Sequence, residues 1–256
     1  MSPEIQPRTW PKLTVVHLYP HEMDINGDYG NLLVLLKRLQ WRGIPVERVR
    51  YNVGDEFPAE PDLIFGAGGE VSAESAVQRD LLRLKERIGN EVEGGAAVLA
   101  LGGTYQLFGR SIKNAEGEEI EGLGIFDMVT VFEGERFTGN VVAESERFGT
   151  VVGFENHSGK SYIGRSDKPF ARVLSGNGNN AKDNGEGVQL KSTIGSYLYG
   201  PLLPKNPAIA DFLIAKALEH KLGSRLDTEE LAPLTEIDEC AARAAIVARS
   251  RIRGEM

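Results

Sequence analysis

The sequence predicts an α/β fold, flavodoxin-like in type, with a mainly parallel central sheet, helices on both faces and an antiparallel extension. Three patterns support this prediction. Over the first half of the chain, apolar runs of strand length alternate with stretches of helical apolar spacing. Two of these runs end in glycine-rich turns, as buried parallel strands often do. Beyond Leu123, alternating segments follow one another without helices, which is typical of antiparallel strands.

The first half should contain four strands and two helices. The strands are LTVVHLY from Leu13, IPVERVRY from Ile44, PDLIFGAGG from Pro61 and AAVLALGG from Ala96. One helix is indicated by the spacing of the leucines within residues 32–39, and another by the amphipathic pattern of residues 75–88. The carboxyl ends of parallel strands share one sheet edge, so the loops after the first, third and fourth strands should line a common site.

The second half predicts shorter strands, a polar loop and two helices. Strand-like segments between Leu123 and Val173 are IFDMVTVF, FTGNVVAES, TVVGFENH and FARVLS. Residues 175–187 have almost no apolar content, which predicts a long mobile loop or hairpin tip. STIGSYLYG is strand-like, and helices are expected at 208–221 and 235–253. We expect one domain over residues 1–256, with a loose extension at 1–11 and a helical tail at 235–256.

Composition excludes several classes of protein. The chain has 37 acidic and 29 basic residues, and its formal charge of -8 disfavours nucleic acid as a partner. Its single cysteine, Cys240, excludes an internal disulfide and four-cysteine metal sites. No apolar run approaches the length of a membrane helix, and the amino-terminal residues lack the apolar core of a secretion signal. We therefore expect a cytoplasmic protein without a membrane span.

The most informative segment is VLALGGTYQLFG, residues 98–109, which predicts a buried strand, a sharp glycine turn and a helix. Nucleophilic enzymes use such an elbow to present a reactive side chain, with small neighbours for clearance and backbone N–H groups for an oxyanion. Gly102 occupies the nucleophile's place in this pattern.

This segment resembles V-L-A-I-C-G-G-Y-Q-L-L-G of the CobB/CobQ-like class I glutamine amidotransferases. Other blocks agree in order over about residues 13–220: NGDYGNLLVLLKRLQWRGI, DLIFGAGGE, GFENHSGKS and GSYLYGPLLPKNP. Within that family the chain is most similar to the GatD-type glutaminase subunits of lipid II isoglutaminyl synthases. The resemblance implies a heterodimer with a MurT-like subunit of Mur-ligase type, which would use ATP and Mg to amidate the stem-peptide D-glutamate of peptidoglycan. No cofactor is expected on this chain.

The resemblance also implies that the catalytic pair is missing. Gly102 falls on the family's cysteine, and Tyr199 falls on its histidine in L-H-G-P. Glycine cannot form a thioester, and a phenol with a pKa near 10 is a poor proton shuttle at neutral pH. Loss of both positions fits relaxed selection better than one engineered cysteine replacement, which stays an alternative for Gly102. We expect a chain without normal glutaminase activity.

Five further residues are candidates for substrate binding. The resemblance assigns Arg136, in ERFTGN, to a substrate contact and Gly68 and Gly69 to the oxyanion-side turn, while Gln106 keeps the register of the elbow helix. His157 could belong to the pocket or be a loop histidine bonded to the backbone. For Arg136 the alternative is an ordinary charge at a strand end. Glu70, where the family has glutamine, would be suspected if restoring the pair gave no activity.

Other residues have structural interpretations. Thr104 should lie on the helix with its side chain directed away from the pocket, and Cys240 should be a small, partly buried residue of the tail helix. His17, within an apolar strand, should be a hydrogen-bonded structural residue. GAGGE and GLGIF lack the endings of phosphate-binding loops, so there is no case for ATP on this chain.

Three functional hypotheses follow. The first is a non-catalytic homologue that organises a Mur-ligase-like partner. The second is a working glutaminase subunit whose nucleophile is unusual or comes from the partner. The third is a stand-alone protein whose altered pocket binds an amide or amino acid.

Overall fold

The computed structural model describes residues 9–24, 27–69 and 71–253, and its central feature is a mainly parallel sheet. The strands lie in the order β11 (Val188–Leu190), β12 (Thr193–Ser196), β4 (Ala97–Leu101), β3 (Leu63–Gly66), β1 (Leu13–Leu18) and β2 (Val46–Tyr51). Only β11 pairs antiparallel. The four strands predicted in the first half are confirmed.

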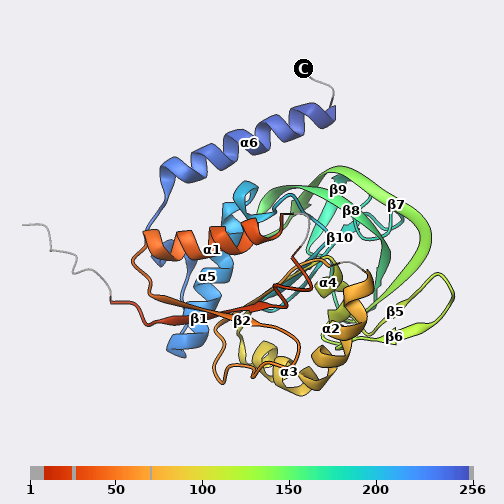
Figure 1. The fold of residues 1–256 in the computed structure, drawn as a ribbon. Coiled ribbons are helices and arrows are strands. Elements are labelled where there is room, and N and C mark those ends of the chain that lie inside the picture. Colours follow the sequence, from red (N-terminus) through yellow and green to blue (C-terminus); the bar gives the residue numbers. More distant parts are fainter. Residues whose placement is uncertain (1–8, 25–26, 70, 254–256) are drawn as a thin grey trace, which may run out of the picture.

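Helices cover both faces of this sheet, as predicted (Figure 1). Alternate strand residues such as Phe65 and Ile64 enter two separate apolar cores. One core lies under α1 (Tyr29–Trp41) and α5 (Pro207–Leu222), and the other lies under α2 (Val71–Arg83) and α3 (Lys85–Gly94). The single helix predicted at 75–88 is in fact these last two helices, which meet at Leu84.

The predicted antiparallel extension is a second, mostly antiparallel sheet, and two of its strands are longer than expected. β7 (Met128–Ser145) and β8 (Gly149–Ile163) make a long hairpin, flanked by β5 (Ser111–Lys113), β6 (Glu119–Glu121), β9 (Ala171–Ser175) and β10 (Gly185–Glu186). Of these strands, β5 pairs parallel with β7. Pairing of β7 with β8 shifts register between Phe132 and Phe137. This interruption explains why the sequence resembles several short strands rather than two long ones.

The polar segment at 175–187 is a hairpin connection between β9 and β10, the second of the two forms predicted for it, and residues 181–184 at its tip are exposed. Asn179 and Asn180 are buried. The buried carboxylate of Glu155 accepts hydrogen bonds from the backbone N–H groups of Asn177 and Gly178. This segment has no large apolar side chains to anchor it, and hydrogen bonds fix its conformation instead.

The carboxyl-terminal region runs through short 3-10 turns, η1 (Leu203–Lys205) and η2 (Thr228–Glu230), into α6 (Thr235–Arg253). The predicted tail helix is confirmed to Arg253, and residues 254–256 lie outside the described part. α6 lies across the outer side of α1 in Figure 1, with only Ala241 of its described side chains buried. Residues 1–8 of the predicted loose extension are likewise outside the described chain.

Cys240 is exposed, so the prediction that it is partly buried is wrong. Only one stripe of α6 contacts the body of the protein, and Cys240 lies off that stripe, with Arg243 donating a hydrogen bond of 3.1 Å to its sulfur.

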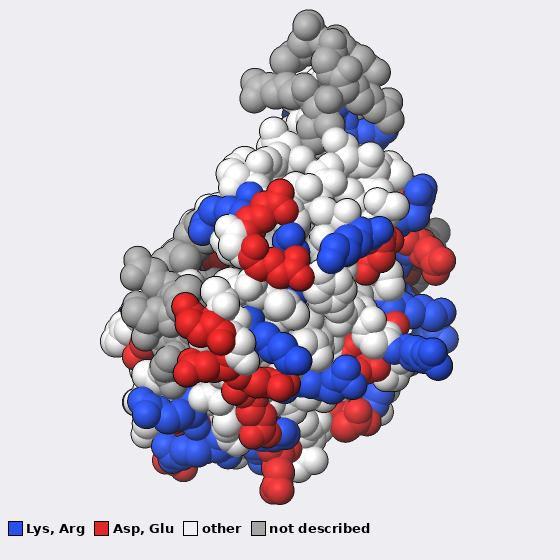
Figure 2. Space-filling view, turned by 90° about the vertical axis from the view of Figure 1, so that its right-hand side faces the viewer, with Lys and Arg blue, Asp and Glu red and all other residues white. Residues whose placement is uncertain are grey.

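The surface carries mixed charge. On the face drawn in Figure 2, acidic and basic side chains are interspersed, without a broad area of one sign. This face therefore offers no basic stripe for a nucleic acid backbone. Across the residues that the structure describes, no helix is long and apolar enough to cross a membrane.

Candidate functional site

Gly102 forms the predicted elbow between β4 and the short helix α4 (Gly103–Phe108). Its backbone has φ 52° and ψ -117°, a conformation that residues with a side chain rarely adopt. The Gly102 N–H donates to the carbonyl of Ser196 on β12, and its own carbonyl accepts from the N–H of Gln106. The chain thus keeps the sharp turn of an elbow at a position that presents no side chain.

A second glycine turn, Gly66 to Gly69, follows β3 beside the elbow. The hydroxyl and N–H of Thr104 both donate to the carbonyl of Ala67, at 2.7 and 3.3 Å, and so join the two turns. Thr104 is therefore on the helix, as predicted, and its hydroxyl is used in a structural bond. Gly69 packs against the loop after β1, where a Cβ at this position would lie 2.7 Å from Cγ of Met23.

Asp28 supports the glycine turn through a hydrogen bond. Its side chain is fully buried, and its Oδ2 accepts a hydrogen bond of 3.1 Å from the N–H of Gly68. Burial raises the pKa of Asp28 to about 7, although the bond from Gly68 opposes the rise. Asp28 was not among the predicted site residues, despite lying within the NGDYGN block that carried the family resemblance.

Tyr199 follows β12 and reaches the elbow. Its backbone is held by β8, since the N–H of Tyr199 donates to the carbonyl of Phe154 at 2.7 Å and the N–H of Phe154 donates to the carbonyl of Tyr199 at 3.3 Å. The side chain is 5% exposed. The two turns and Tyr199 therefore meet in the interior of the protein.

The tyrosine ring fills the space in front of the elbow. A Cβ placed on Gly102 with ideal geometry would lie 2.9 Å from Cε1 and Cζ of Tyr199, and closer still to its hydroxyl oxygen. A Cβ on Gly68 would lie 3.4 Å from Cε1 of the same ring and 3.5 Å from Oδ2 of Asp28. Gly102, Gly68 and Tyr199 are thus brought together, and the phenol takes the place of any side chain at 102.

Gln106 and His157 meet at a different point, around Tyr197. Gln106 Nε2 donates to the Tyr197 hydroxyl at 3.1 Å, and the His157 ring stacks on the Tyr197 ring at 3.7 Å between centroids. His157 Nδ1 also lies 2.8 Å from the carbonyl of Gly159. Burial lowers the pKa of His157 to about 4, so the ring is neutral at physiological pH.

His157 therefore makes the backbone bond of its structural alternative, although from strand β8 and not from a loop. Tyr197, the centre of this cluster, was missed because an aromatic residue in an apolar strand has no signal that separates it from ordinary core.

Arg136 is exposed on β7 and donates from Nε to Oδ1 of Asn156 on the neighbouring strand, at 2.7 Å. Its charge contributes to the lowered pKa of His157. His17 is buried in β1, 2.9 Å from a guanidinium nitrogen of Arg48, as expected of a structural residue. Glu70 lies outside the described residues.

Comparison with known proteins decides the family. Residues 14–207 match the model of the CobB/CobQ-like glutamine amidotransferase domain. The chain belongs to this family. The matched range contains the elbow, the glycine turn and Tyr199, whereas α6 lies beyond it.

Two CobB/CobQ-like relatives are similar over most of their length. The lipid II isoglutaminyl synthase (glutamine-hydrolyzing) subunit GatD of Staphylococcus aureus is 37% identical over 82% of this chain and 86% of its own length. The subunit of the same name from Streptococcus pneumoniae is 37% identical over 83% of each chain. A crystal structure of a glutamine amidotransferase superposes with a TM-score of 0.55 at 16% identity, covering 79% of this chain and 98% of that one. The fold predicted from the sequence is confirmed.

Proposed function

We propose that this chain is the amidotransferase-like subunit of a two-subunit enzyme of the lipid II isoglutaminyl synthase type, and that it does not hydrolyse glutamine. The position of Tyr199 is the observation that supports the absence of glutamine hydrolysis. Its phenol lies where the side chain of a nucleophile at Gly102 would have to be. Amide cleavage through a covalent intermediate needs a nucleophile at the elbow and a base beside it, and neither glycine nor a buried phenol supplies these groups.

The partner half of the proposal is supported by the similarity to two subunits named GatD. By that analogy the partner is a Mur-ligase-like, MurT-type chain. It would bind ATP and Mg and amidate the stem-peptide D-glutamate, in the cytoplasm. A docking surface depends on the scaffold and not on the elbow, so it can persist after the elbow has lost its reactive groups.

The test is to purify the chain with the Mur-ligase-like partner from the same cell and to measure both association and ammonia release. We expect the two chains to elute together by size exclusion, and we expect no ammonia from glutamine either for the complex or for this chain alone. The Staphylococcus aureus subunit, purified in the same way with its own partner, is the positive control.

Each half of the proposal has its own contrary outcome. Glutamine turnover that persists through further purification would show a working glutaminase. Failure of the two chains to associate, with both correctly folded, would remove the subunit role and favour the stand-alone binding protein.

A further inference from the structure

The ring of Tyr199 leaves no room for a side chain at position 102. An ideal Cβ there would approach the ring carbons of Tyr199 to 2.9 Å, a separation that real Cβ atoms essentially never show. The ring has little freedom to move away. The backbone of Tyr199 exchanges two hydrogen bonds with that of Phe154, and the residue is only 5% exposed. Glycine at 102 is therefore a requirement of tyrosine at 199.

The same ring also lines the oxyanion-side turn. Its Cε1 and hydroxyl would lie 3.4 and 3.7 Å from a Cβ on Gly68, which is ordinary van der Waals contact. One aromatic ring thus fills the space between the elbow and the turn, the two elements between which the carboxamide of a substrate would have to lie. Asp28 holds the turn through its bond to the Gly68 N–H.

We propose that Tyr199 is a built-in plug of the former amide site, coupled to Gly102, and that it excludes carboxamides such as the side chain of glutamine. This inference rests on the proposed function only in taking the Gly102 turn as the former site of amide cleavage. The two replacements then act as one unit. A cysteine restored at 102 alone meets the phenol, whereas a smaller side chain at 199 reopens the space.

The first experiment is a double-mutant cycle on thermal stability, with the full chain and no partner. Gly102→Ala should lower the unfolding midpoint by about 5 to 12 °C, because it adds both backbone strain and a clash. In a Tyr199→Ala background, the same change should lower the midpoint by less than half as much. Gly223→Ala is the matched control, since Gly223 has φ +64° but nothing within 4 Å of its Cβ position. Its effect should be the same in both backgrounds.

The second experiment asks what the opened site binds. Tyr199→Ala should show a thermal shift with millimolar L-glutamine, whereas the wild-type chain should show none. This measurement needs no substitution at 102, so it stands even if the Gly102 variants do not fold. Two results would contradict the proposal that Tyr199 blocks the site. One is an equal effect of Gly102→Ala in both backgrounds, and the other is an equal thermal shift of wild type and Tyr199→Ala with glutamine.

These outcomes are separate from those of the proposed function. Absence of coupling between positions 102 and 199 contradicts the proposal that Tyr199 blocks the site, but leaves the ammonia and association results unaffected. Ammonia release by the wild-type chain removes the proposed loss of activity, while the stability cycle still reports whether the two residues are coupled.

Discussion

Asp28 is fully buried, and its Oδ1 has no hydrogen-bond partner among the described residues. Burial raises its pKa from 3.8 to about 7, with the Gly68 N–H lowering it and Asp24 raising it further. The folded chain therefore holds this proton more tightly than the unfolded chain does. The resulting stabilisation is fully present below about pH 4 and is lost as the pH rises through about 7.

Replacing Asp28 with asparagine should remove this pH dependence while keeping an acceptor for the Gly68 N–H. Between pH 5 and pH 8, the free energy of unfolding of the wild type should fall by about 2 kcal/mol relative to Asp28→Asn. Urea unfolding at several pH values measures the difference. Glu116→Gln, an exposed side chain, is the control. A constant difference between wild type and Asp28→Asn would contradict the raised pKa.

At this scale, the family resemblance could place Gly102, Gly68 and Tyr199 at one site, because each lies in a block that matches a family motif. It could not place Asp28 against Gly68, which is 40 residues away, because that contact depends on how the loop after β1 returns to the sheet edge. For the same reason, Gln106 was assigned to the substrate pocket, although its amide contacts Tyr197.

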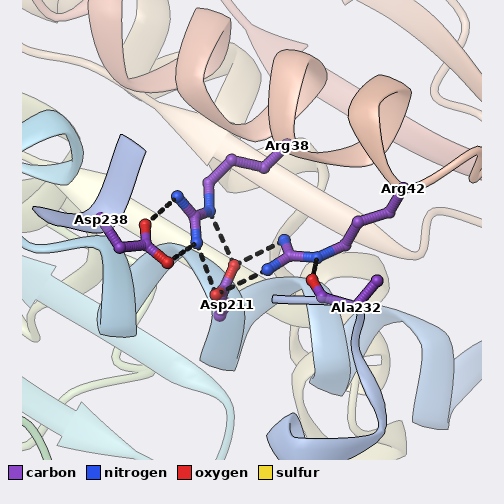
Figure 3. Close-up of polar contacts among 5 residues, drawn as sticks. All are labelled: Arg38, Arg42, Asp211, Ala232 and Asp238. Carbon is purple, nitrogen blue, oxygen red and sulfur yellow. Dashed lines mark hydrogen bonds and ion pairs between the residues drawn. The ribbon is translucent and has the colours of Figure 1, made fainter. Parts of the chain in front are cut away.

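Among the elements, α6 is tied to the body of the protein through a cluster of charges (Figure 3). Arg38 of α1 is 2% exposed and donates to both Asp211 of α5 and Asp238 of α6. Arg42 donates to Asp211 and to the carbonyl of Ala232. Burial alone would raise the pKa of Asp211, but hydrogen bonds and charge from the two arginines hold it below its usual value.

The two carboxylates of this cluster should have different effects on stability. Asp211→Ala leaves two arginines without their shared partner and should cost about 3 to 5 kcal/mol of unfolding free energy. Asp238→Ala should cost only about 1 kcal/mol, because Asp238 is partly exposed and Arg38 keeps Asp211.

Amide hydrogen exchange should locate the second effect, with faster exchange in α6 for Asp238→Ala and little change for Glu239→Ala on the same helix. Equal costs for the two aspartates, or unchanged exchange in α6, would contradict this account.

Elements with a strong apolar period could be predicted to within a few residues, as β1 and α5 show. The break between α2 and α3 could not, because the amphipathic pattern continues across Leu84. The sequence left open whether 175–187 is a mobile loop or a hairpin tip, because the hydrogen bonds that hold the hairpin come from Glu155 on β8, a residue distant in sequence. Burial of polar side chains by distant partners leaves no local pattern.

For the whole molecule, the central claim is that the scaffold of an ammonia-producing enzyme is kept while the elbow holds no reactive side chain. The fold, the elbow conformation and the family match over residues 14–207 support the first part. The second part depends on Gly102, Tyr199 and the buried surroundings that they share.

The most direct measurement is intact-mass spectrometry of the purified wild-type chain after treatment with 6-diazo-5-oxo-norleucine, a glutamine-like electrophile that alkylates an activated nucleophile. We expect the mass to stay unchanged under conditions that fully label the Staphylococcus aureus subunit. A stoichiometric adduct that maps to the elbow or to any residue around Tyr199 would contradict the account.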